Sequence, residues 1–143
     1  MFSRIVMRCF TAAALLAAGF WYGKETELNA QRKNRVFELR TYTAMDGKLG
    51  DLQARFRNHT IKLFEKHGMT NIGYWVPQDE PASRNTLIYI VAHQSREAAK
   101  KSWDAFRNDP AWIKARDASE ANGKLVVKVE SVFLDPTDYS DIR

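Results

Sequence analysis

The chain of 143 residues contains a single cysteine, Cys9, which lies close to the N-terminus. Residues 24–143 therefore contain no thiol, and this excludes disulfide bonds, thiolate catalysis and cysteine-ligated metal from that part of the chain. The residues before Cys9 are Val6, Met7 and Arg8, which do not form a lipobox. We therefore do not expect a lipid to be attached at this position.

Sequence motifs for common cofactors and nucleophiles are also missing. The chain has no glycine-rich phosphate loop, no G-x-S-x-G and no zinc-binding spacing. Its three histidines, His59, His67 and His93, lack the i, i+4 spacing of a helical metal site. We interpret His67 as a helix-terminal residue and His59 as a semi-buried imidazole beside an apolar stripe. The sequence thus predicts no catalytic residues, no metal and no cofactor.

The folding part of the chain has almost no excess charge of either sign. Residues 1–35 hold six Lys and Arg against two Glu, which gives +4, and residues 36–143 hold sixteen against fifteen acids, which gives +1. A domain charge of +1 does not fit a phosphate backbone, so we expect no nucleic-acid partner. With 45% hydrophobic residues and only seven Gly and four Pro, the composition is that of one ordinary domain.

The first 23 residues are typical of a targeting segment. Arg4 and Arg8 precede an uncharged run from Cys9 to Gly23, and Ala17-Ala18-Gly19 offers a cleavage zone. We predict a signal peptide and a periplasmic or secreted protein. The alternatives are a retained N-terminal membrane anchor, which would be its only membrane attachment, and a mitochondrial presequence. Residues 24–35 are predicted to be a polar spacer.

Residues 36–143 alternate strand and helix patterns. β-rich runs at 36–43, 71–77, 86–93 and 124–134 predict four strands. The spacing of Leu49, Leu52, Phe56 and Leu63 predicts a helix that ends at His67-Gly68. Ser95 and Asp109-Pro110 are predicted to cap two further helices before a stop at Asn122-Gly123. The order is βαββαβ, which predicts an α+β ferredoxin-like plait with a four-stranded antiparallel sheet and helices on one face.

Residue alternation along the strands predicts which side chains face the helices. We place Ile88, Ile90, Ala92, Phe37 and Leu39 toward the helices, together with Val127 and Val129. The open face then carries Glu38, Arg40, Tyr42, Leu87, Tyr89, Val91, His93, Lys128 and Glu130. Such a mixture of aromatic and charged groups is unsuited to full solvation, so we expect a second copy of the chain to cover it in a homodimer.

The open face as predicted supplies the candidate site. Its candidate cavity or ligand-binding residues are Glu38, Arg40, Tyr42, Tyr74, Tyr89 and His93. The alternative for Glu38, Arg40, Lys128 and Glu130 is that they form cross-strand ion pairs. Trp103, Phe106 and Trp112 have the spacing of helix core residues.

Three segments together carry a family resemblance: FELRTYTAMDGKLGDLQARF, KHGMTNIGYW and WDAFRNDPAWIKARDASEANGKLVVKVESVFLDPTDYS. Over about residues 36–140 the chain resembles the bacterial form of the NIPSNAP family. The resemblance implies a dimeric α/β barrel. Family members are linked to vesicular, mitochondrial and protein-interaction roles, and no catalytic residues are carried over from them.

The resemblance and the residues together predict an exported homodimer that binds a small molecule or a protein partner, rather than an enzyme. The alternative is a cofactor-free monooxygenase-like enzyme that acts on a small aromatic compound in the barrel cavity. A third function, by analogy with the wider fold superfamily, is haem binding, in which His93 or His59 is the axial ligand.

Overall fold

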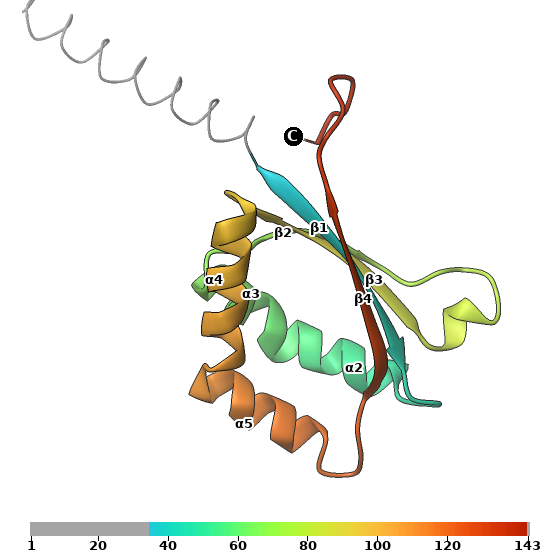
Figure 1. The fold of residues 1–143 in the computed structure, drawn as a ribbon. Coiled ribbons are helices and arrows are strands. Elements are labelled where there is room, and N and C mark those ends of the chain that lie inside the picture. The colour runs from blue at the N-terminus through green and yellow to red at the C-terminus, as the bar shows by residue number, and fades with distance from the viewer. Residues whose placement is uncertain (1–34, 143) are drawn as a thin grey trace, which may run out of the picture. The chain divides into compact units, whose positions relative to one another are not determined.

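The structure is a computed structural model that describes residues 35–142 (Figure 1). The predicted leader, its cleavage zone and the spacer up to residue 34 lie outside the described residues. Within residues 35–142, no helix has the length and apolar character needed to cross a membrane.

The described residues form four strands and a set of short helices. The strands are β1 (Val36–Ala44), β2 (Thr70–Trp75), β3 (Thr86–His93) and β4 (Val126–Leu134). Between β1 and β2 lie α2 (Leu49–Arg55), the π-helical segment η1 (Phe56–Thr60) and α3 (Ile61–Lys66). A 3₁₀ turn, η2 (Ala82–Arg84), precedes β3, and α4 (Arg96–Arg107) and α5 (Pro110–Ser119) precede β4.

The sheet confirms the predicted plait. Its strand order is β2-β3-β1-β4, and every neighbouring pair is antiparallel. The main helices all lie on one side of the sheet in Figure 1. The two central strands, β1 and β3, therefore have one face toward the helices and one face away from them.

The predicted helix ends are confirmed by their local geometry. Ser95 Oγ accepts a hydrogen bond from the Ala98 amide at 3.1 Å, and Asp109 Oδ1 accepts one from Ala111 at 2.8 Å. Gly68 and Gly123 follow their helices with φ of 77° and 107°, which an L residue adopts only with strain. These signals are local in sequence, and this is why they could be predicted.

The first helical region contains a feature that the apolar spacing did not predict. Five residues at its centre, Phe56–Thr60, form a π-helical segment instead of a regular α-helix. Thr60 Oγ1 donates to the main-chain oxygen of Arg55 at 3.3 Å, five positions earlier. Such segments occur often at functional sites, because they redirect side chains on either side of the helix.

The predicted orientation of β1 and β3 is wrong. Leu87, Tyr89 and Val91 are buried against the helices, where they pack with residues such as Leu52, Phe64 and Phe106. Glu38 faces the same layer and accepts a hydrogen bond from Trp103 on α4. Strand β3 is apolar on both faces, so alternation alone does not say which face meets the helices. Charged groups on β1 are buried because they are paired there.

The open face of the sheet is mostly apolar. Cross-strand neighbours share a face, and the strand registers therefore align Phe37 with Ala92 and Leu134, and Leu39 with Ile90 and Val132. Trp75 and Val132 are 50% and 54% exposed. The C-terminal residues 135–142 form a pocket of about 300 Å³ with Phe37, Ile72 and Ile90.

Candidate functional site

All six predicted cavity residues come together, but on the helix side of the sheet. Glu38, Arg40 and Tyr42 alternate along β1, and the register places Arg40 opposite Tyr89 of β3. Tyr74 of β2 is in turn paired with Tyr89. The group divides into a charged cluster around Glu38 and His93 at one end and a row of tyrosines at the other.

Glu38 is the centre of the charged cluster. Its side chain is 2% exposed and accepts hydrogen bonds from Arg40 Nη1 at 2.6 Å, Trp103 Nε1 at 2.6 Å and Ser131 Oγ at 2.5 Å. His93 Nε2 lies 3.1 Å from Glu38 Oε2, the oxygen that also accepts from Trp103. Burial raises the pKa of Glu38, but the hydrogen bonds of His93, Ser131 and Trp103 and the charge of Arg40 outweigh it and lower the pKa to about 2.

Arg40 is clamped between Glu38 and an aromatic ring. Its guanidinium lies 4.3 Å from the centroid of the Trp103 ring, an arrangement that favours the cation. Burial lowers the pKa of Arg40, but Tyr42, Tyr89 and Glu38 raise it above its ordinary value. Arg40 Nε and His93 Nδ1 are buried and have no hydrogen-bond partner.

The tyrosines form a continuous row across the sheet. Tyr89 Oη donates to Tyr42 Oη at 3.2 Å, and the Tyr74 and Tyr89 rings stack with centroids 5.4 Å apart. Burial is the main cause that raises the pKa of Tyr89 and of Tyr74 well above the usual range. Both phenols are therefore neutral at physiological pH.

This arrangement is poorly suited to acid–base catalysis. A general base works best with a pKa near the working pH, whereas Glu38 stays ionised and is surrounded by donors. The expected ion pairs exist, but they run along strands rather than across them: Arg40 pairs with Glu38, and Lys128 pairs with Glu130 at 2.9 Å. Trp103 and Ser131 belong to the Glu38 cluster, and the sequence did not single out either as its partner.

Tyr74 also lines a pocket of about 370 Å³ beside the edge strand β2. Its walls are aromatic and aliphatic, and two polar side chains from the α2–η1 region complete the lining: Gln53, Phe56, Arg57, Ile61, Tyr74, Trp75, Val76 and Leu87. Apolar walls with a few polar groups are typical of small-molecule sites. We call this the Tyr74 pocket.

Of the two remaining histidines, His67 lies where the sequence predicts it and His59 does not. His67 follows α3 as predicted, and its Nε2 lies 2.7 Å from Asp109 Oδ2, which also accepts from Lys66 Nζ at 2.6 Å. These two side chains and the Ala111 amide hold the pKa of Asp109 well below its usual range. His59 is exposed, so its predicted semi-buried position is wrong. Residues 35–142 contain no group of three side chains that could together hold a metal ion.

Comparison with known proteins gives a consistent result. The chain superposes on a NIPSNAP family protein from Agrobacterium tumefaciens with a TM-score of 0.66 at 23% identity, covering 76% of this chain and 99% of that one. A NIPSNAP-like domain protein from Burkholderia xenovorans gives 0.65 at 17% identity, covering 76% and 90%. SnoaB, a cofactor-independent oxygenase from Streptomyces nogalater, gives 0.52 at 12% identity, covering 76% and 98%.

These structural likenesses establish the fold, a four-stranded antiparallel sheet with helices on one face. No curated protein matches the chain. The sequence itself shows the family, because the family model described as NIPSNAP matches residues 37–141, which are nearly all of the residues that the structure describes. The chain therefore belongs to the NIPSNAP family.

Proposed function

We propose that this NIPSNAP domain is a homodimeric module that binds a small aromatic molecule in the Tyr74 pocket. The observation that carries the proposal is the lining of that pocket, in which Phe56, Tyr74 and Trp75 supply aromatic surface and Arg57 and Gln53 supply polar contacts. A volume of about 370 Å³ is within the range of pockets that hold small ligands.

The proposal is for binding rather than turnover. Glu38 accepts three hydrogen bonds and has a pKa of about 2, and burial keeps Tyr89 protonated. The oxygenase alternative has the fold of SnoaB in its support. This alternative requires side chains that are available to a substrate: Arg40, Tyr42, Tyr89 and His93. Instead, Tyr89 donates a hydrogen bond to Tyr42, and Arg40 and His93 contact Glu38.

The homodimer is supported by the open face of the sheet. Leu39, Ile88, Ile90 and Val132 lie on this face, which the helices do not cover. Contiguous apolar surface of this kind marks a protein contact. Light scattering on the full chain is expected to give twice the chain mass.

Export is proposed from the composition of the leader alone. Arg4 and Arg8 followed by an uncharged run are typical of a signal peptide. Mass spectrometry of the protein isolated from its native cell is expected to find a chain that begins near Ala18 or Gly19. An intact chain that begins at Met1 would contradict cleavage.

The binding proposal is tested by filling the Tyr74 pocket. Ile61 lines it, and Ile61→Trp places an indole inside. Titration calorimetry with 1-naphthol should show binding to the original chain and an affinity at least about ten-fold weaker in the variant.

Ile113→Trp is the matched control, because Ile113 is an exposed residue of α5 and is not among the lining residues. The control should bind 1-naphthol as the original chain does. Equal weakening by both substitutions, or no binding to the original chain, would contradict the proposed site.

A further inference from the structure

A second pocket lies against the same helical region and shares no lining residue with the Tyr74 pocket. It has a volume of about 310 Å³ and is lined by residues of α2, η1 and α5: Asp51, Ala54, Arg55, Asn58, His59, Ala115, Ala118 and Ser119. We call it the Arg55 groove. The π-helical segment separates the two pockets, because Phe56 and Arg57 line one and Asn58 and His59 line the other.

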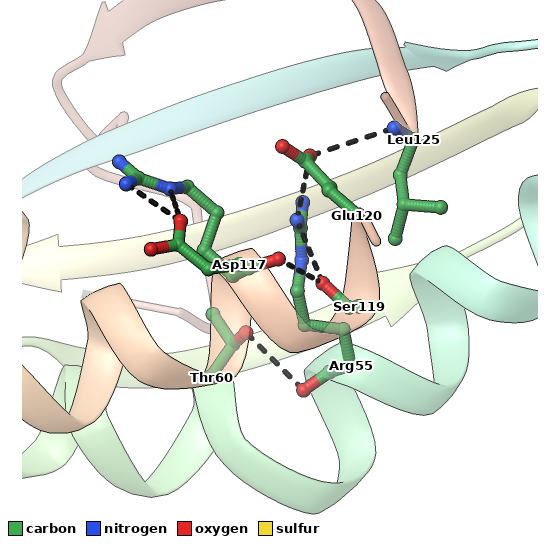
Figure 2. Close-up of polar contacts among 7 residues, drawn as sticks. Arg55, Thr60, Asp117, Ser119, Glu120 and Leu125 are labelled. Carbon is green, nitrogen blue, oxygen red and sulfur yellow. Dashed lines mark hydrogen bonds and ion pairs between the residues drawn. The ribbon is translucent and has the colours of Figure 1, made fainter. Parts of the chain in front are cut away.

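Arg55 is held firmly by one edge of its guanidinium. Its side chain is 4% exposed, and Nη1 donates to Glu120 Oε1 at 2.9 Å and to Ser119 Oγ at 3.3 Å. Figure 2 shows Arg55 reaching from the α2 region to these two residues at the end of α5. The guanidinium also lies 5.2 Å from the ring centroid of Trp112. Its position is therefore fixed without any ligand.

The other edge of the guanidinium is unused. Arg55 Nε is buried and has no hydrogen-bond partner, and Nη2 makes no hydrogen bond to the described residues. The N–H groups of Nε and Nη2 point the same way and form the fork that binds the two oxygens of a carboxylate. A buried donor without an acceptor is unfavourable, so an acceptor placed at this edge would be stabilising.

The acidic side chains beside the groove already have cationic partners. Glu120 is already bonded to Nη1 of Arg55, and Asp51 is paired with Lys48 at 3.1 Å. His59 is exposed among the lining residues. The other lining residues are the polar Asn58 and Ser119 and three alanines, Ala54, Ala115 and Ala118, whose methyl groups suit a short hydrocarbon chain.

We propose that the Arg55 groove binds a short-chain monocarboxylate. The carboxylate accepts from Nε and Nη2 of Arg55, and its hydrocarbon chain lies against Ala54, Ala115 and Ala118. This site is independent of the Tyr74 pocket, and binding at one does not require binding at the other.

The test is a nuclear magnetic resonance titration of the full chain with sodium butyrate, in which the Nε–H signal of Arg55 is observed. The signal is assigned by through-bond correlation, which leaves the packing of Arg55 intact. We expect a saturable shift of this signal, since its proton gains an acceptor. No shift would mean that the groove holds water only and would overturn the proposal.

Two further arms distinguish the ligand. Sodium chloride at equal ionic strength is expected to leave the signal in place, and inorganic phosphate to move it less than butyrate. An equal response to chloride indicates a salt effect, and an equal response to phosphate indicates a general oxyanion site. Either result would overturn the assignment to a monocarboxylate.

A blocking variant locates the hydrocarbon chain. Ala118 is an exposed lining residue, and Ala118→Phe should weaken butyrate binding at least about ten-fold. Ala105→Phe is the matched control, because Ala105 is exposed on α4 and is not among the lining residues. Equal affinity in the two variants would exclude the groove as the site.

Discussion

The two faces of the sheet carry different kinds of side chain. The helix face buries Glu38 and His93, together with the half-buried Arg40 and tyrosine hydroxyls. The open face, which no helix covers, displays aliphatic side chains such as Ile90 and Val132. The helix face thus encloses a polar cluster within a hydrophobic core, whereas the open face leaves aliphatic side chains without a helix to cover them.

This difference shows that partners, and not polarity, decide where a side chain is placed. Glu38 is tolerated in the helix layer because Arg40, Trp103, Ser131 and His93 surround its carboxylate with donors. Within the described residues, no helix layer covers the open face. Its exposed apolar surface is what a second copy of the chain would cover.

Removing the buried carboxylate of Glu38 should destabilise the fold. In Glu38→Ala, the donors of Arg40, Trp103 and Ser131 lose their acceptor inside the protein. We expect the free energy of unfolding to fall by about 3–5 kcal/mol, as is typical when one member of a buried ionic cluster is removed. Equilibrium unfolding in urea, followed by circular dichroism, measures this loss.

The matched control is Glu130→Ala, since Glu130 also pairs with a cation but is exposed. Its loss should be about 1 kcal/mol or less, because exposed ion pairs contribute little. Similar losses in the two variants would mean that the Glu38 cluster does not stabilise the fold.

Lowering the pH should also destabilise the protein through Glu38. The pKa of Glu38 is about 2 in the folded protein, against 4.5 for the unperturbed group. The unfolded chain therefore takes up this proton first, and stability falls as the pH drops through 4.5 toward 2. The difference corresponds to about 3 kcal/mol of stability that is present at neutral pH.

Asp109 also has a lowered pKa and acts in the same direction, so a variant is needed to separate the two. In Glu38→Gln, the acid dependence should be shallower than in the original chain by the contribution of Glu38. Urea unfolding at a series of pH values measures both curves. Parallel curves would show that the titration of Glu38 is not coupled to folding.

The succession of strands and helices along the chain, the helix caps and the glycine stops followed from sequence because each depends on a few neighbouring residues. Ser95 bonds to Ala98, and Gly68 and Gly123 supply the positive φ that ends their helices. The same locality explains why six dispersed residues could be grouped as one site. Alternation along β1 and β3 keeps Glu38, Arg40, Tyr89 and their neighbours on a single face, whichever face it is.

Features that depend on distant partners could not be predicted. The partners of Arg55, Ser119 and Glu120, are 64 and 65 positions away along the chain. The acceptor role of Glu38 depends on Trp103 and Ser131, 65 and 93 positions away. Without these contacts a glutamate in a strand is indistinguishable from a solvent-facing residue, and β1 and β3 were therefore assigned the wrong way round. On β4 the prediction was right, because Val129 lies opposite Tyr42 on the helix side and Lys128 and Glu130 lie on the open face.

A charge placed on the open face tests the other half of the comparison. Val132 is 54% exposed and lies opposite Leu39, so Val132→Lys should fold but place an ammonium group where two copies would meet. Because burying a charge is unfavourable, the dissociation constant of the dimer should rise at least about ten-fold, which corresponds to about 1.4 kcal/mol. Light scattering over a dilution series of the full chain measures this dissociation constant.

Ile113→Lys on α5 is the control, since Ile113 is exposed on the helix side and its substitution should leave association unchanged. If the original chain is monomeric at every concentration, or if both variants dissociate equally, the open face is not the surface through which the protein associates.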